Sequence, residues 1–163
     1  MRKISSTSAL VLAVASLATA APANAVAQVE LSNDLSKCRK GSGPAMLVTV
    51  TGVKASTGKI RVQSYRANAS EWMAKGRWIN RIEAPARAGT MTFCVPLPAA
   101  GNYGIAIRHD VNGNGSTDLT KDGGGISNNP SINIFNLGKP KYSKAAVPVG
   151  QEVKSIFIDM RYM

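Results

Sequence analysis

The chain has 163 residues and a formal net charge of +11 at pH 7, with 44% hydrophobic and 18% charged residues. This length allows one ordinary domain that buries its own core. No apolar stretch is long enough for a membrane-spanning helix, and no recognisable nucleic-acid-binding motif accompanies the basic composition. Composition therefore argues against a helical membrane protein and against a nucleic-acid partner, in spite of a sequence pI near 10.1.

The first 25 residues have the pattern of an export signal. Arg2 and Lys3 form a charged start, residues 9–15 begin an apolar core, and residues 23–25 give the alanine-x-alanine pattern of a cleavage site. No cysteine follows this site, so a lipid anchor is not expected; a retained amphipathic anchor is the alternative. We expect residues 1–25 to be removed and the remainder to be exported, to the periplasm or to the cell exterior.

Basic residues are spread over the expected mature chain rather than gathered in one segment. Cleavage would leave about 138 residues, enough for one domain, and would lower the net charge from +11 to +9 because Arg2 and Lys3 are lost. A dispersed positive field attracts anionic surfaces without fixing specificity. The expected partners are anionic envelope polysaccharide or a lipid surface, and the sequence does not indicate an oligomeric state.

Two cysteines remain after cleavage, Cys38 and Cys94. An even number of cysteines in an exported chain favours a disulfide, because the compartment is oxidising; two free thiols are the alternative. A bond between them would close a loop of about 57 residues and contribute about 4 kcal/mol in the chain-entropy treatment. Metal binding by two sulfurs, with one histidine in the whole chain, is less favoured.

Short segments of the chain alternate apolar and polar residues in the manner of β-strands: 46–51, 59–65, 90–95, 103–110 and 154–162. Glycine and proline separate them, a pattern typical of a sandwich or barrel. Period-two alternation assigns these side chains to the core: Met46, Val48, Val50, Ile60, Val62, Met91, Phe93, Val95, Tyr103, Ile105, Ile107, His109, Ile156, Ile158, Met160 and Tyr162. Cys94 then lies on the opposite face of its strand, where an N-terminal segment carrying Cys38 can cross it.

The expected organisation is an all-β chain with one folded domain. Residues 1–25 are the signal peptide, residues 26–44 a loosely ordered N-terminal segment, and residues 45–163 a single β-sandwich domain. Helical periodicity is limited to a short stretch at residues 70–75. We find no internal repeat and no second domain.

Trp72 and Trp78 lie in a short segment, residues 71–79, that mixes aromatic and basic residues. Such amphipathic rings can stack on a sugar or lie at a membrane surface, so the pair is a candidate ligand patch. The alternative is that both rings cap one end of the sandwich and contact no ligand.

The segment that begins at residue 110 has the pattern of a calcium loop. Oxygen-bearing side chains recur at alternate positions: Asp110, Asn112, Asn114, Ser116 and Asp118. A hard cation such as Ca²⁺ needs clustered oxygen ligands, and a glycine after the third of them permits the sharp turn. Lys121 stands at the twelfth position, where a hand-type loop needs glutamate, and the flanking elements are strands rather than helices. We expect at most weak Ca²⁺ binding; the alternative is a turn held by side-chain-to-backbone hydrogen bonds.

The region around this loop resembles a bacterial family, domain of unknown function 2141. Residues 97–110 match the family's leucine-proline-glycine-tyrosine strand, and residues 109–115 match its histidine-aspartate-x-asparagine-glycine-asparagine-glycine loop. Residues 125–129 match its glycine-x-serine-asparagine-asparagine element, and the resemblance extends over residues 45–163. It implies an exported, immunoglobulin-like or transthyretin-like antiparallel β-sandwich and no particular activity. Residues 119–124 depart from the glycine-proline-lysine-glutamate type of stretch usual in the family, so a function that depends on that stretch is not implied.

His109 is the only histidine of the chain. It could act as a proton shuttle or a metal ligand, but it shares a strand face with apolar residues while its neighbour Asp110 points to the other face; we favour a structural role. No second histidine is present to support a serine nucleophile. We expect a non-enzymatic protein of the cell envelope, and the alternative is a calcium-stabilised carbohydrate- or surface-binding module.

Overall fold

β-Strands dominate the computed structural model of the chain, which describes residues 28–132, 136 and 138–163. The strands are β1 (Val29–Leu31), β2 (Ala45–Val53), β3 (Lys59–Arg66), β4 (Asn80–Pro85), β5 (Gly89–Pro96), β6 (Gly101–Asp110), β7 (Gly123–Ile126), β8 (Val147–Val149), β9 (Val153–Asp159) and β10 (Arg161–Tyr162). They are accompanied by the 3₁₀ helix η1 (Leu35–Cys38) and the α-helix α1 (Tyr142–Ala145). The expected signal peptide, residues 1–25, lies outside the described residues.

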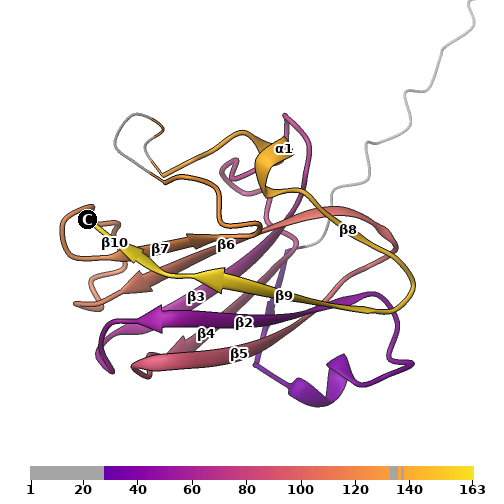
Figure 1. The fold of residues 1–163 in the computed structure, drawn as a ribbon, viewed down its shortest axis with the longest axis horizontal. Helices are drawn as coiled ribbons and strands as arrows, with labels where there is room; N and C mark the ends of the chain where they lie inside the picture. Colours follow the sequence, from indigo (N-terminus) through magenta and orange to yellow (C-terminus); the bar gives the residue numbers. More distant parts are fainter. Residues whose placement is uncertain (1–27, 133–135, 137) are drawn as a thin grey trace, which may run out of the picture.

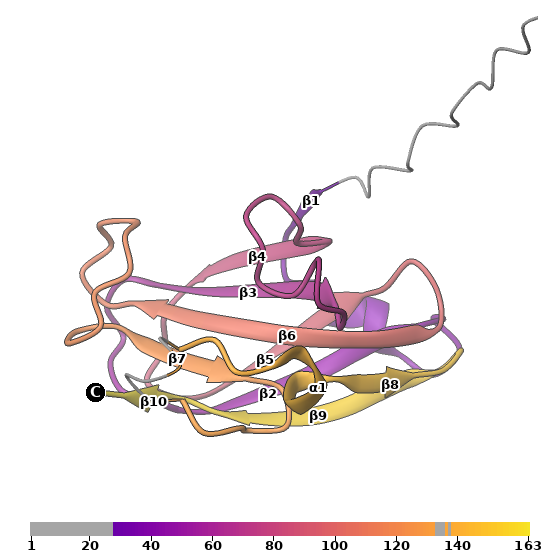
Figure 2. The ribbon, with the colours of Figure 1, turned by 90° about the horizontal axis from the view of Figure 1, so that it is seen from above.

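The strands form two sheets that pack face to face (Figure 1). The larger sheet has the order β1-β4-β3-β6-β7-β10, with β8 also paired to β6, and the smaller sheet has the order β5-β2-β9. Figure 2 shows the two layers from above, with the C-terminus at the same end as the loop between β6 and β7. The expected β-rich, two-layered architecture is confirmed, but the sheets are mixed rather than antiparallel because β1 pairs with β4, and β9 with β2, in parallel.

The core lies between the sheets and is built by the alternation expected from the sequence. Val48 on β2, Phe93 on β5, Ile105 on β6 and Ile158 on β9 are completely buried. Each adjacent residue on these strands faces outward or toward a loop, because successive side chains point to opposite faces of a sheet. No helix among the described residues is long and apolar enough to cross a membrane.

The last predicted strand is divided at Met160 between the two sheets. Up to Asp159 the chain pairs with β2 in the smaller sheet, and Arg161 then pairs with Gly124 of β7 in the larger one. Between them the Met160 amide donates to the Thr51 carbonyl at 2.9 Å. Periodicity alone could not reveal this exchange, since Met160 remains buried and the alternation is unbroken. The result brings β10 beside β7.

Residues 28–44 are more ordered than the loosely structured segment expected from the sequence. β1 adds to the edge of β4, and Asp34 caps η1 by accepting the Ser36 amide at 3.0 Å. Cys38 at the end of η1 is bonded to Cys94, with a Cα–Cα distance of 5.6 Å. The predicted disulfide is confirmed. The two elements have only three and four residues, too few for a periodic pattern to be recognised.

Asparagine side chains cover both edges of the smaller sheet. Asn33 exchanges two hydrogen bonds with the β5 backbone, at 2.8 and 3.1 Å. Asn129 does the same for the β9 backbone, at 3.3 and 2.9 Å. An amide has one donor group and one acceptor group, so each side chain takes the place of a neighbouring strand at an otherwise unpaired edge.

Candidate functional site

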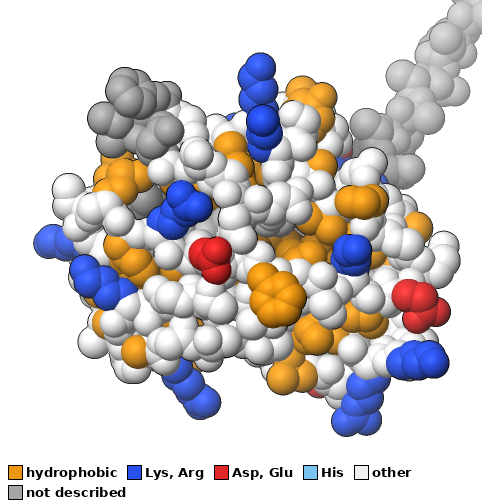
Figure 3. All heavy atoms as spheres, viewed as in Figure 1, with side chains coloured by type: hydrophobic (Ala, Val, Ile, Leu, Met, Phe, Trp, Pro, Cys, Tyr) orange, Lys and Arg blue, Asp and Glu red, His pale blue; other side chains and the backbone are white. Residues whose placement is uncertain are grey.

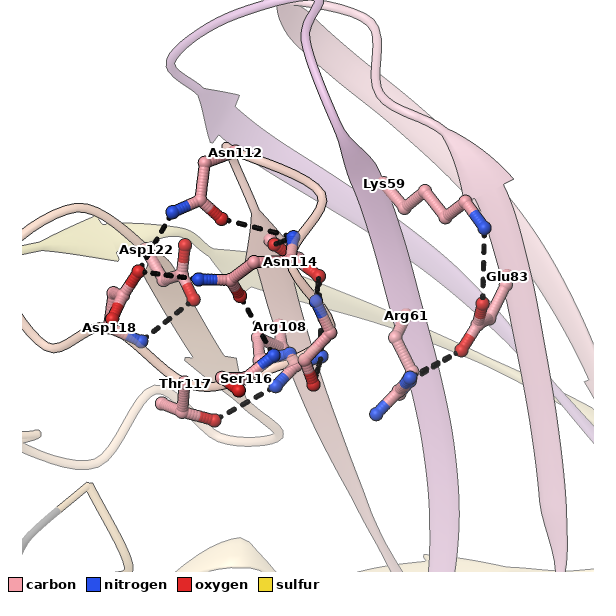
Figure 4. A network of polar contacts seen from close by, with 12 residues as sticks. Lys59, Arg61, Glu83, Arg108, Asn112, Asn114, Ser116, Thr117, Asp118 and Asp122 are labelled. Atoms are coloured by element: carbon pink, nitrogen blue, oxygen red, sulfur yellow. Dashed lines mark hydrogen bonds and ion pairs between the residues drawn. The ribbon is translucent and has the colours of Figure 1, made fainter.

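Figure 4 shows the polar network of the loop between β6 and β7, with Asn112, Asn114, Asp118 and Asp122 among its labelled residues. The loop is organised around the buried carboxylate of Asp110. One oxygen accepts the amide of Asn114 at 3.2 Å, and the other accepts the amide of Gly115 at 2.8 Å. Gly113 and Gly115 have φ of 69° and 79°, in the left-handed region that glycine tolerates. The chain therefore turns sharply around Asp110, as the sequence pattern predicts.

The other predicted ligand residues gather at Asp118. Its Oδ2 atom accepts the side-chain amides of Asn112 at 2.8 Å and of Asn114 at 3.0 Å. The amide of Ser116 donates to Asn114 Oδ1 at 2.8 Å. Four of the five predicted residues thus contribute side chains to one network, in which amide nitrogens rather than oxygens face the Asp118 carboxylate.

Asp122 closes the loop, a role that the sequence pattern did not assign. It is buried, and its two oxygens accept the amides of Val111 at 3.1 Å and Asp118 at 3.0 Å. The calcium pattern does not include this residue, because it falls after the twelfth position. An acidic residue placed immediately before a glycine-rich strand was the available signal.

Arg108 attaches the loop to the sheet. Its guanidinium donates to Thr117 Oγ1 at 2.9 Å and to the Gly115 carbonyl at 3.0 Å, and it lies 3.6 Å from Asp110 Oδ2. The positive charge partly neutralises Asp110. Within the described residues, no group of three or more histidine, cysteine, aspartate or glutamate side chains could hold a metal ion. In this conformation the carboxylates of Asp110, Asp118 and Asp122 accept hydrogen bonds from other groups of the loop.

His109 is completely buried, and both of its ring nitrogens are hydrogen-bonded. Nε2 lies 2.8 Å from the Thr57 carbonyl, which only accepts, so Nε2 carries the proton. Nδ1 then accepts the hydroxyl of Tyr162 at 2.6 Å, and that hydroxyl accepts the Lys54 amide at 3.0 Å. This chain of hydrogen bonds ties β6, β10 and the β2–β3 turn together, in agreement with the structural role favoured from the sequence.

The Ser127-Asn128-Asn129 segment holds the other end of β7. Ser127 is buried; its hydroxyl donates to the Ala145 carbonyl at 2.5 Å and accepts the Ile105 amide at 3.0 Å. Asn128 donates to the Ala146 carbonyl at 2.9 Å. Asn128 and Asn129 have φ of 64° and 48°, a region in which asparagine is favoured among non-glycine residues. The segment is a structural connection between strands.

The loop and this segment contain two of the three motifs that resemble the family. A family model described as an uncharacterized protein conserved in bacteria (DUF2141) matches residues 48–156. The chain belongs to the DUF2141 family. No curated protein and no solved structure matches it. The predicted family is therefore confirmed, and these two DUF2141 motifs hold the two ends of β7.

Tyr162 and Tyr65 should make the stability of the DUF2141 domain depend on pH in basic solution. Burial raises the pKa of both phenols above 10.0. Because the pKa is higher in the folded state than in the unfolded state, folding favours the neutral phenol. The resulting contribution to the free energy of unfolding is complete below pH 10 and is lost as pH rises through the folded-state pKa. We expect the melting temperature to fall above about pH 10, and to fall less in Tyr162→Phe and Tyr65→Phe; equal pH slopes in all three proteins would contradict this.

Trp72, one of the two candidate ligand residues, is buried. Its ring meets Tyr65 edge-on at 5.6 Å, and its Nε1 donates to the Pro140 carbonyl at 2.8 Å. It takes the packing role given as the alternative, and it is not exposed for stacking on a sugar. Trp78 is half-buried with the Arg81 guanidinium 4.3 Å above its ring. Residues 70–75, the one helical stretch suggested by periodicity, form turns.

A pocket of about 720 Å³ lies beside the DUF2141 loop. Its walls include Ala106 and Arg108 of β6, the glycines of β7, Arg161 of β10 and Ile132 from the following loop. The volume is within the range of about 300–1,000 Å³ typical of small-molecule sites. Sequence reasoning did not find this pocket, since it forms where β10 meets β6 and β7, which lie more than 30 residues earlier in the chain.

Proposed function

We propose that this DUF2141 protein is an exported, non-enzymatic domain of the cell envelope with an immunoglobulin-like or transthyretin-like sandwich. The observation that carries the proposal is the disulfide between Cys38 and Cys94, which ties the N-terminal segment across the smaller sheet. Disulfides form and persist in oxidising compartments and are rare in the bacterial cytoplasm. Together with the export pattern of residues 1–25, the bond supports a location beyond the inner membrane.

Two further observations support a binding or structural role over catalysis. The only histidine of the chain is engaged at both nitrogens, so its ring is not poised to accept a substrate proton. Figure 3 shows basic side chains dispersed over one face, with few acidic ones between them. Such a surface suits anionic envelope polysaccharide or an anionic lipid surface as a partner.

Export is tested by producing the whole chain and a form without residues 1–25 in a bacterial host. We expect the whole chain in the periplasmic or extracellular fraction, with both cysteines resistant to alkylation until a reductant is added. The shortened form should stay in the cytoplasm with reactive thiols, because that compartment keeps cysteines reduced. Cytoplasmic retention of the whole chain would contradict the proposal.

We propose as a second function that residues 110–118 bind Ca²⁺ weakly. The supporting observation is the convergence of Asn112 and Asn114 on Asp118, because rotation of the two amides would direct their oxygens to the same point. Only Asp110 and Asp118 would contribute charge, and Arg108 offsets part of it. The residues therefore fit a weak site, in the millimolar to submillimolar range of extracellular modules.

Thermal unfolding distinguishes Ca²⁺ binding from a hydrogen-bonded turn. At a tenfold excess over the dissociation constant, Ca²⁺ should stabilise the protein by about 1.4 kcal/mol. Mg²⁺ should do less, since it demands a tighter octahedral shell. Asp118→Asn should abolish the effect, whereas Asp159→Asn, an exposed carboxylate outside the loop, should retain it. Superimposable curves with chelator and with calcium would leave only the turn.

A further inference from the structure

Sheet register places Arg108, Gly124 and Arg161 side by side on β6, β7 and β10. Residues in register on neighbouring strands present their side chains to the same face. Strands lie about 4.8 Å apart, so the Cα atoms of the two arginines stand about 10 Å apart across the glycine. We call these three residues the arginine row.

Gly124 leaves a gap in this row. A Cβ atom built on it would meet nothing within 4 Å, and its φ lies outside the left-handed region. The adjacent glycines differ, because a Cβ on Gly123 would lie 2.4 Å from the Tyr162 ring and one on Gly125 would lie 2.8 Å from Ile158. These two face the core, whereas Gly124 forms an open floor between the two arginines, both of which line the 720 Å³ pocket.

The pocket continues from the arginine row onto apolar side chains. Ala106 and Ile126 stand in register one step along the same face of β6 and β7. Met73 and Ile132 come from neighbouring loops, and all four residues belong to one hydrophobic cluster. We call these four residues the apolar wall. The pocket is therefore amphipathic, with a cationic end and an apolar end.

Hydrogen-bond donors remain free at the cationic end. Arg161 is exposed and has no ion pair with any described residue. Arg108 Nε is the only buried side-chain nitrogen or oxygen of the described residues without a hydrogen-bond partner. The two carboxylates that line the pocket already accept hydrogen bonds: Asp122 from two backbone amides, and Asp118 from two side-chain amides. An anionic group on a ligand would supply the missing acceptor.

We propose that this pocket binds a single-chain anionic amphiphile, namely a long-chain carboxylate. Its carboxylate lies over Gly124 in the arginine row, and its alkyl chain lies along the apolar wall. The pocket volume is in the range that holds a small molecule such as a fatty carboxylate. The register of the three strands places the arginine row at one end of the pocket and the apolar wall at the other. This site is distinct from the proposed surface attraction, and it adjoins the proposed Ca²⁺ loop, with which it shares Asp118.

The proposal is tested by calorimetric titration of the exported, disulfide-bonded protein with decanoate below its micellar concentration. We expect saturable binding of one decanoate per chain. Acetate, which has the head group alone, should show no binding, and decyltrimethylammonium should bind at least about tenfold more weakly, as expected for loss of a charge-assisted hydrogen bond. Equal binding of the cationic and anionic amphiphiles would overturn the proposal, as would the absence of saturable decanoate binding.

Two variants locate the ligand. Gly124→Leu fills the gap, and Arg161→Gln removes the free guanidinium; each should weaken decanoate binding at least about tenfold. Gly150→Leu, whose Cβ likewise meets nothing within 4 Å, and Lys154→Gln are the matched controls outside the pocket and should bind like the parent. Melting temperatures verify that all four proteins are folded. Parent-like affinity in both pocket variants would overturn the assignment.

Discussion

Replacement of Gly104 by alanine is expected to destabilise the domain by about 3 kcal/mol, the range of a severe overpacking substitution. A Cβ at this position would lie 2.3 Å from Cζ3 of Trp72. The indole cannot withdraw easily, since it is buried, packs edge-on against Tyr65 and donates to the Pro140 carbonyl. Denaturant unfolding of the purified protein measures the loss.

Gly124→Ala is the matched control, because it makes the same change on a strand of the same sheet where a Cβ has open space. It should change stability by no more than about 0.5 kcal/mol. Trp72→Phe should partly rescue Gly104→Ala, since the smaller ring leaves room for the added methyl. Equal effects of the two glycine substitutions, or strict additivity with Trp72→Phe, would contradict the packing account.

His109→Ala is expected to destabilise the domain by about 4 kcal/mol, through a cavity and two unpaired polar groups. The removed ring leaves the Thr57 carbonyl and the Tyr162 hydroxyl without the partners that they have at 2.8 and 2.6 Å. The Tyr162 ring packs against the core, where an unsatisfied polar group costs about 1–3 kcal/mol, whereas the Thr57 carbonyl lies in the more exposed β2–β3 turn and adds less. Denaturant unfolding again measures the loss.

A double-mutant cycle with Tyr162→Phe separates hydrogen bonding from simple space filling. If the His109–Tyr162 bond matters, the two substitutions should couple by about 0.5–3 kcal/mol, the usual range for residues in direct contact. A coupling energy near zero would show that His109 only fills volume. That result would contradict a stabilising role for the His109–Tyr162 hydrogen bond.

Local patterns predicted the parts of the fold that depend on local chemistry. The alternation around Phe93 placed that ring in the core and turned Cys94 outward, where Cys38 crosses it. Clustered Asx residues and glycines after Asp110 predicted a sharp turn, which the structure contains. In both cases the structure is determined by a few residues that are neighbours in the chain, so a short segment of sequence is sufficient to predict it.

Features that depend on distant partners could not be predicted in this way. Met160 continues the apolar alternation while its neighbours pair with different sheets, because strand pairing leaves no mark on side-chain periodicity. The position of Trp72 depends on Gly104, and the pocket depends on Gly124 meeting Arg161 across strands. Such contacts join segments more than 30 residues apart, and no local pattern reports them.

The central claim, an exported domain closed by its own disulfide, is tested most directly by the intact mass of the protein recovered without reductant. The sample is treated with an alkylating agent before analysis. We predict the mass of residues 26–163 minus two hydrogens, with no alkyl group added. A mass that retains residues 1–25, or that carries one alkyl group on each cysteine, would contradict the claim.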